Sequence, residues 1–115
     1  RGQQVTTADR NFSRSCRAPF GVVPGMGVFL VTFDLADPGQ TRPAVLDEIR
    51  KSAGWAKLSS STYAVTTQEF ANQLLARVRK QVHPDDTIYV ISLRKAWEGH
   101  GAQEVSQWLS THLHY

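Results

Sequence analysis

Two aspartates, Asp34 and Asp37, lie where an apolar stretch of the chain gives way to a Pro-Gly turn. A carboxylate at the rim of a central strand suits a hard cation, because Mg²⁺ takes oxygen ligands and keeps several of its waters. Two copies of Asp34 brought together by a two-fold axis would share one ion, which would polarise a phosphate and supply hydroxide. The alternative interpretation is that both side chains cap the turn and the helix start through hydrogen bonds, and the residue types alone favour it. Asp34 and Asp37 are therefore candidate metal ligands, and Asp34 is a candidate catalytic residue.

A run of hydroxyl side chains, Ser59-Ser60-Ser61-Thr62, is the second candidate. Hydroxyls and backbone N–H groups bind phosphate, so Ser61 is a candidate for positioning one in a catalytic site. The alternative is a polar hairpin turn, which the composition favours by itself. No histidine lies near this run in the sequence to act as a base, and a serine nucleophile therefore has little support.

Basic side chains that could contact phosphates lie in two places along the chain. These candidate nucleic-acid-binding residues are Arg77, Arg79, Lys80, Arg94 and Lys95. The alternative interpretation is a solvated helix face, which is the default for such charges. No Walker loop, dinucleotide-binding fingerprint, nucleophile elbow or zinc finger is present, and the four histidines show no zinc spacing.

The excess of positive charge lies in the first part of the chain. Of the 13 lysines and arginines, four precede Met26, which leaves nine; of the 10 acidic residues, one precedes it, which also leaves nine. The part from Met26 onward is therefore formally neutral, and the overall charge of +3 is no evidence for a nucleic-acid-binding surface on it.

Length and composition are typical of one folded domain. The chain has 115 residues, of which 41% are hydrophobic and 20% charged. No apolar run approaches the roughly 20 residues that span a bilayer, so we expect no membrane partner. The single cysteine, Cys16, has no partner within the chain, which favours a reducing, cytoplasmic location.

The pattern of apolar residues predicts the elements that position these side chains. Residues 1–25 lack apolar periodicity and are predicted to form a flexible N-terminal extension to a domain at residues 26–115. We expect strands at 27–34, 55–58, 62–66 and 87–93, helices at 42–53 and from Thr66 to about Gln81, and a C-terminal helix at 102–113. The first helix is predicted to have Thr41 as N-cap and Gly54 as a left-handed C-cap, and the second to begin with a Thr66–Glu69 capping box and to bury Phe70. The order predicts an α+β fold of ferredoxin-like βαββαβ type, with an antiparallel four-stranded sheet and an extra C-terminal helix.

Both helices should lie on one side of that sheet, because crossover connections are right-handed. The strand at 27–34, GVFLVTFD, is apolar on both of its faces, so the other side of the sheet also needs cover. Either a second copy or the C-terminal helix covers it. Together these points predict a homodimer.

Three short segments resemble known proteins. VFLVTFDLAD, SSTYAV and DTIYVISL resemble strands of the small CRISPR-associated nuclease family and of the wider VapD-like group. A closer likeness is to short proteins of the SinR family, which share a strand ending in Asp, then Pro-Gly-Gln, an S-T-aromatic strand and a W…G…WL segment. The matching positions here are Asp34, Pro38-Gly39-Gln40, Ser61-Thr62-Tyr63, Trp97, Gly99 and Trp108-Leu109.

The resemblance implies a ferredoxin-like dimer in which Asp34 binds a divalent metal, with Mg²⁺ expected. The first function hypothesis is accordingly a dimeric, metal-dependent endonuclease that hydrolyses phosphodiesters of RNA or DNA. The alternative is a non-catalytic dimeric adaptor or toxin-like module that binds nucleic acid or protein. A third hypothesis, a ligand-sensing domain, would need a pocket that nothing in the sequence marks.

Overall fold

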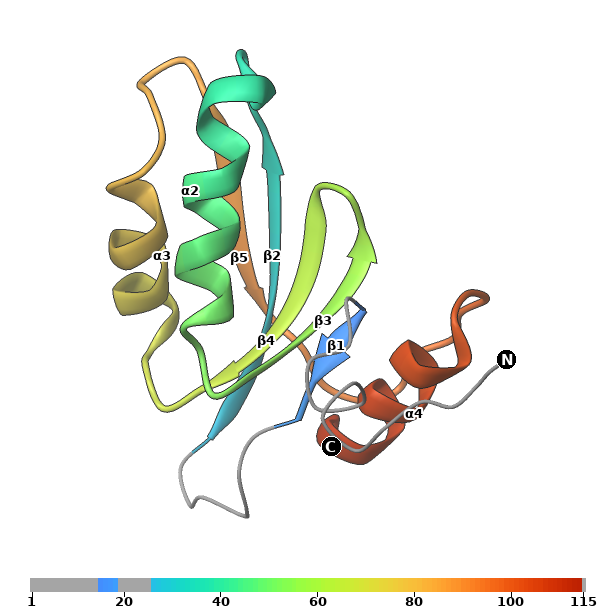
Figure 1. The fold of residues 1–115 in the computed structure, drawn as a ribbon. Helices are drawn as coiled ribbons and strands as arrows, with labels where there is room; N and C mark the ends of the chain where they lie inside the picture. Colours follow the sequence, from blue (N-terminus) through green and yellow to red (C-terminus); the bar gives the residue numbers. More distant parts are fainter. Residues whose placement is uncertain (1–14, 19–25, 115) are drawn as a thin grey trace.

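An antiparallel sheet with the strand order β1-β3-β4-β2-β5 lies at the centre of the described part of the chain (Figure 1). The computed structural model describes residues 15–18 and 26–114. Its elements are β1 (Cys16–Arg17), β2 (Gly27–Asp34), α2 (Pro38–Arg50), β3 (Gly54–Ser59), β4 (Thr62–Thr67), α3 (Ala71–Arg79), β5 (Thr87–Ser92) and α4 (Gln103–His112). None of the helices in these two ranges is both long and apolar enough to cross a membrane.

The predicted α+β class is confirmed, but the prediction of four strands is wrong. A fifth strand, β1, pairs with β3 through Cys16↔Ala56 and Arg17↔Trp55. A strand of two residues is too short to show the period-two pattern by which strands are recognised in a sequence. β1 falls within residues 1–25, which were predicted to be a flexible extension; of that segment only residues 15–18 are among the described residues.

One face of the sheet packs against α2 and α3, which lie side by side over it (Figure 1). Alternate residues of β2, namely Phe29, Val31 and Phe33, point to this face and are buried. They form the larger core cluster together with Val45, Leu46, Ile49, Trp55, Tyr63, Val65, Leu74 and Val78. This cluster fixes the position of β2, whose last residue is Asp34.

The opposite face of the sheet is covered in part by α4. A second core cluster joins Val28, Ala56 and Ala64 of the sheet to Val105, Trp108, Leu109 and Leu113. Trp108 also donates a hydrogen bond from Nε1 to the backbone oxygen of Arg17, at 3.0 Å, and this bond ties α4 to β1. Tyr89 and Ile91 of β5 remain 62% and 50% exposed. The C-terminal helix therefore supplies part of the cover that the apolar strand requires, and β5 lies beyond it.

The first helix begins earlier than predicted. It starts at Pro38, because proline is well suited to the first turn, and Asp37 is its N-cap. Thr41, which was predicted to be the cap, is instead buried inside the helix. Gly54 was predicted to be a left-handed cap and is instead the first residue of β3.

The second helix begins later than predicted, at Ala71. Thr67 and Glu69 bond to each other: the threonine hydroxyl donates to Oε1 at 2.9 Å, and the glutamate N–H donates to the hydroxyl at 3.2 Å. The predicted Thr66–Glu69 capping box is therefore wrong, because Thr66 lies in β4 and Glu69 bonds to Thr67 instead. Phe70 becomes the N-cap residue and is 73% exposed, so the prediction that it is buried is wrong.

Tyr63 gives a test of the main core. The side chain is fully buried, and its hydroxyl has no hydrogen-bond partner among the described residues. An unsatisfied buried hydroxyl is unfavourable, so we expect Tyr63→Phe to leave the free energy of unfolding unchanged or to raise it by about 1 kcal/mol in urea denaturation. The exposed Tyr89→Phe is the control and should change nothing. A clear loss of stability in Tyr63→Phe alone would show that the hydroxyl has a partner.

Candidate functional site

Asp34 is the last residue of β2 and its side chain is exposed. Its Cα partner on β5 is Thr87. No hydrogen bond or ion pair joins its carboxylate to any described residue. Because side chains alternate along a strand, Asp34 shares a face with Leu30 and Thr32, on the side of the sheet away from α2 and α3. The structure thus places an uncommitted carboxylate at the rim of a central strand.

Asp37 lies just beyond that rim, at the start of α2. Its backbone oxygen accepts the N–H groups of Gln40 and Thr41, at 3.2 and 3.1 Å, while its side chain makes no capping hydrogen bond. The side-chain capping that was weighed as the alternative role for Asp37 is therefore not observed. The carboxylate is exposed, like that of Asp34.

The turn between β3 and β4 lies at the same end of the sheet. The Phe33 N–H donates to the Ser61 oxygen at 3.0 Å, which places Ser61 beside the end of β2. The Ser61 N–H donates to Ser59 Oγ at 3.3 Å. Arg42 of α2 donates from Nε and Nη2 to the Ser60 oxygen, at 3.0 and 2.9 Å, and so ties the turn to the helix. Asp34 and Ser61 are brought to one rim, and Arg42 joins them there although nothing in the sequence pattern indicated it.

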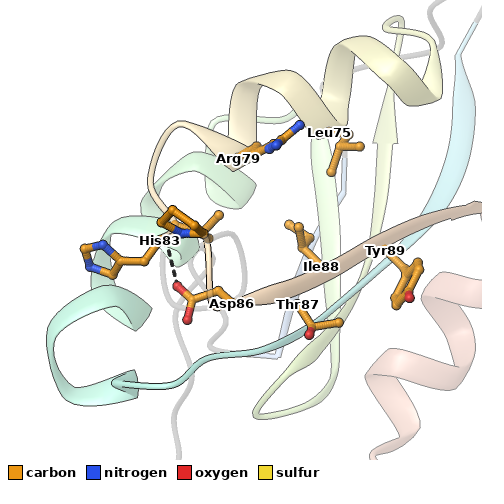
Figure 2. A pocket seen from close by; sticks show the side chains of 9 residues that line it. Leu75, Arg79, His83, Asp86, Thr87, Ile88 and Tyr89 are labelled. Atoms are coloured by element: carbon orange, nitrogen blue, oxygen red, sulfur yellow. Dashed lines mark hydrogen bonds between the residues drawn. The ribbon is translucent and has the colours of Figure 1, made fainter.

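Asp86 is a further rim residue that the sequence did not indicate. Its Oδ1 accepts the Ala36 N–H and its Oδ2 accepts the His83 N–H, each at 2.8 Å; the second bond is drawn in Figure 2. These two bonds, the one from His83 first, hold the pKa of the Asp86 carboxyl below its ordinary value. They join the loop after β2 to the loop before β5, and Ala36 lies between Asp34 and Asp37. Asp86 thus helps to hold the loop that carries the two free aspartates.

The residues at the rim could supply some, but not all, of the oxygen ligands that a hard cation such as Mg²⁺ needs. Asp34 and Asp37 offer carboxylate oxygens, which are the donors that Mg²⁺ prefers. No group of three or more His, Cys, Asp or Glu side chains suited to a metal occurs in the described ranges. One copy of the chain therefore needs further oxygen ligands from water, from a phosphate or from a second copy.

Arg77, a predicted nucleic-acid contact, is engaged within the fold. Its guanidinium donates to both Glu69 carboxylate oxygens, with Nη2–Oε1 at 2.9 Å and Nε–Oε2 at 3.0 Å. It also donates to Ser52 Oγ at 2.8 Å and to the Glu48 backbone oxygen. These bonds join the end of α2 to α3 and to the segment before it. The structure thus gives Arg77 a bonding role between helices.

The other four predicted contacts are exposed and form two groups. Arg79 and Lys80 lie at the end of α3, near the start of β5. Arg94 and Lys95 follow the other end of β5. Because β5 has six residues, the two groups are separated by a strand of about 20 Å. The structure does not bring the basic residues together into one patch, nor does it place Arg94 and Lys95 at the rim with Asp34.

The Arg77 bonds give a test in acid. Hydrogen bonds from Lys51 to Glu48 and from Arg77 to Glu69 are the main causes that hold both carboxyl pKa values below the ordinary 4.5. A depressed folded-state pKa contributes stability above the unfolded value, and that stability is lost as the pH falls through the folded value. We therefore expect urea denaturation to show stability falling as the pH drops below about 4.5.

The variant Arg77→Met should lower the free energy of unfolding at pH 7 by about 2 kcal/mol and make the fall in acid shallower. Arg79→Met, on the same helix and exposed, is the matched control and should behave like the wild type. If the free energy of unfolding falls equally steeply below about pH 4.5 in Arg77→Met and in the wild type, these bonds do not cause the loss of stability in acid.

Comparison with family models, with curated proteins and with solved structures finds no match to this chain. The likeness to the SinR and CRISPR-associated families therefore stays a prediction from short motifs. The features that bear on function are the rim carboxylates, the sheet face on which Asp34 lies and the surfaces beside it.

Proposed function

We propose that the chain works as a homodimeric, divalent-metal-dependent endonuclease that hydrolyses phosphodiester bonds of RNA or DNA. The observation that carries this proposal is the free carboxylate of Asp34 at the end of β2, an interior strand that pairs with β4 and β5. Asp37 follows Asp34 by three residues, and Asp86 lies across the rim beside Thr87, the strand partner of Asp34. The carboxylate of Asp86 already accepts hydrogen bonds from two N–H groups. Asp34 and Asp37 are thus two rim aspartates whose carboxylates make no hydrogen bond or ion pair to a described residue; Asp85, next to Asp86, is a third.

The dimer follows from the sheet face that Asp34 shares with exposed apolar side chains. Register pairs Thr32 with Tyr89 and Leu30 with Ile91, so these residues and Asp34 lie on one face, beyond the area that α4 covers. The side chains of Tyr89 and Ile91 are 62% and 50% exposed. Such exposure is unusual for large apolar side chains at neighbouring positions on one face of a sheet. A second copy packed on this face would bury them and bring two Asp34 carboxylates close together. The βαββαβ order from β2 to β5 supports a ferredoxin-like dimer of this kind.

The chemistry requires few groups from the protein. When bound, Mg²⁺ would polarise a phosphoryl oxygen and lower the pKa of a bound water. Asp34 and Asp37 would hold the ion, and Ser61 with the nearby turn would position the phosphate. Water adds to phosphorus, the P–O ester bond breaks, and the departing oxygen takes the proton, which leaves a phosphomonoester and a hydroxyl. Arg42 is held by Ser60 at the same rim and adds positive charge there.

A second candidate function is a non-catalytic dimeric module that binds nucleic acid or protein. It is favoured by the small number of ligands: the described residues contain no cluster of three metal-binding side chains. This candidate predicts binding without turnover, and it predicts that Asp34→Asn behaves like the wild type.

The endonuclease proposal is tested with labelled single-stranded RNA, single-stranded DNA and duplex DNA, in Mg²⁺ and in a chelator. We expect cleavage in Mg²⁺ only, and a loss of at least a hundredfold in Asp34→Asn, because the amide is a weaker cation ligand of the same size. Asp47→Asn, an exposed aspartate on α2, is the matched control and should cleave at the wild-type rate. Equal cleavage by Asp34→Asn and the wild type would remove the proposal, and binding without cleavage would favour the second candidate.

The dimer is tested separately by sedimentation velocity. Tyr89→Lys combined with Ile91→Lys should convert a dimer into a monomer, since two ammonium groups would be buried at the proposed interface. Phe70→Lys is the control, because Phe70 is also an exposed large apolar residue but lies at the start of α3. A monomeric wild type across the measured concentrations, or a doubly substituted protein that stays dimeric, would contradict this interface.

A further inference from the structure

The outer edge of β5 has backbone groups without partners in the described part of the chain. β5 pairs with β2 and lies at the end of the sheet opposite β1 (Figure 1). The Leu93 N–H donates to the Val28 oxygen at 2.8 Å, which fixes the phase of the hydrogen bonds between the two strands. Because bonded and non-bonded pairs alternate in an antiparallel ladder, Thr87, Tyr89 and Ile91 direct their backbone groups toward β2. The N–H and C=O groups of the residues between them, Ile88, Val90 and Ser92, are directed outward.

This edge lacks the features that usually protect an edge strand. Its sequence, TIYVIS, has no charged residue and no proline, and its pairing with β2 has no bulge. Proteins commonly blunt an exposed edge with lysine, proline, a bulge or a covering segment. The opposite side of the sheet shows such cover, since β1 pairs with β3 and α4 is tied to β1 by Trp108. A strand-shaped partner is therefore expected at β5 rather than at β3.

A cavity of about 330 Å³ lies beside this edge (Figure 2). Its walls come from α3, from the α3–β5 loop and from the first half of β5. The lining residues are Leu75, Arg79, Val82, His83, Pro84, Asp86, Thr87, Ile88 and Tyr89. The lining combines apolar and polar side chains in similar measure, and it adjoins the strand edge where an added strand would place alternate side chains.

One anionic and one cationic side chain line the cavity, and they differ in whether the protein already bonds them. Asp86 lines it, but both of its oxygens accept N–H groups from the protein. Arg79 lines it as well, and its guanidinium has no hydrogen bond or ion pair to any described residue. A planar guanidinium with free donors pairs well with a carboxylate. The cavity thus offers apolar contact and one uncommitted cationic donor group.

We propose that the free edge of β5 binds an extended peptide segment of a partner protein, which adds to the sheet as a further strand. Its backbone pairs with Ile88, Val90 and Ser92. Alternate apolar side chains enter the cavity between α3 and β5, the intervening ones lie beside Tyr89 and Ile91, and a carboxylate of the segment pairs with Arg79. This mode of recognition combines main-chain bonds for affinity with side-chain pockets for specificity.

A bare peptide fits this edge better than the β5 of a second copy. In a second copy, Ile88 and Val90 already pack against that copy's own core, so they are not available to fill this cavity. Edge-to-edge pairing would also bring a second α3 beside the first. A peptide without a covering helix has side chains free on both faces. This proposal does not depend on metal binding at Asp34, so the two proposals are tested separately.

The test selects ligands from a displayed library of random decapeptides against the full chain, and measures synthetic copies of the enriched sequences by fluorescence anisotropy. We expect alternating apolar positions and an acidic residue or free carboxylate in the selected peptides. Two N-methylated peptides are compared, one methylated at the odd positions and one at the even positions. One should bind at least twentyfold more weakly than the parent and the other less than twofold more weakly, because only one set of N–H groups faces β5. Arg79→Ala should weaken binding about tenfold.

Lys80→Ala is the matched control, since Lys80 is exposed next to Arg79 but does not line the cavity, and it should bind as the wild type does. Ser92→Pro removes an outward N–H and should weaken every selected peptide, with circular dichroism showing that the fold is kept. Failure to enrich any peptide, or binding that is indifferent to both N-methylation and Arg79→Ala, would overturn the proposal. It would also be overturned if Ser92→Pro dissociated a dimer of the chain, because a second copy would then occupy the edge.

Discussion

A central strand that is apolar on both faces is the constraint on which the rest of this fold depends. Phe29, Val31 and Phe33 of β2 point to one side and Val28 and Leu30 to the other, so neither side of the sheet can be left to water. Helices α2 and α3 bury the first set, and α4 buries Val28 on the opposite side. The cover given by α4 ends before β5, so Tyr89 and Ile91 stay exposed on this face.

The same constraint positions Asp34, the proposed metal ligand, at one rim of the sheet. Because β2 is held on both faces, its last residue, Asp34, projects from a rigid strand rather than from a long loop. Two side chains then set the surroundings: Arg42 ties the β3–β4 turn to α2, and Asp86 ties the loop after β2 to the loop before β5. Arg42 and Asp86 thus make structural bonds at this rim, whereas the carboxylates of Asp34 and Asp37, the proposed metal ligands, make none to a described residue.

The two edges of the sheet differ in whether another segment of the chain covers them. β3 is covered by the short strand β1, which α4 in turn holds through Trp108. β5 is uncharged and has no such cover in the described part of the chain, and a partly apolar cavity runs beside it. A free face with exposed apolar side chains and a free edge with unpaired backbone groups are separate surfaces on one strand. We propose a second copy for the face and an extended peptide for the edge; the two use different backbone groups, although both would lie near Tyr89 and Ile91.

Elements whose pattern of apolar residues is local could be predicted from the order of amino acids alone. The apolar runs at β2 and β5, the stripe of Leu74 and Val78 on α3, and the Val105–Trp108–Leu109 face of α4 are all periodic, and their helices and strands were predicted within a few residues. Asp34 was identified as a rim residue for the same reason, since it ends a strand that could be recognised.

Features that depend on contacts between residues far apart in the chain could not be predicted in this way. Arg77 has the residue type of a phosphate contact, yet Glu69, Ser52 and the end of α2 determine its bonds. β1 is too short to have a period, and it exists because β3 offers it an edge. Phe70 has the spacing of a buried residue, but the Thr67–Glu69 turn moves the helix start past it. Periodicity reports which face of an element is apolar, whereas the groups that meet across that face are set only when the chain has folded.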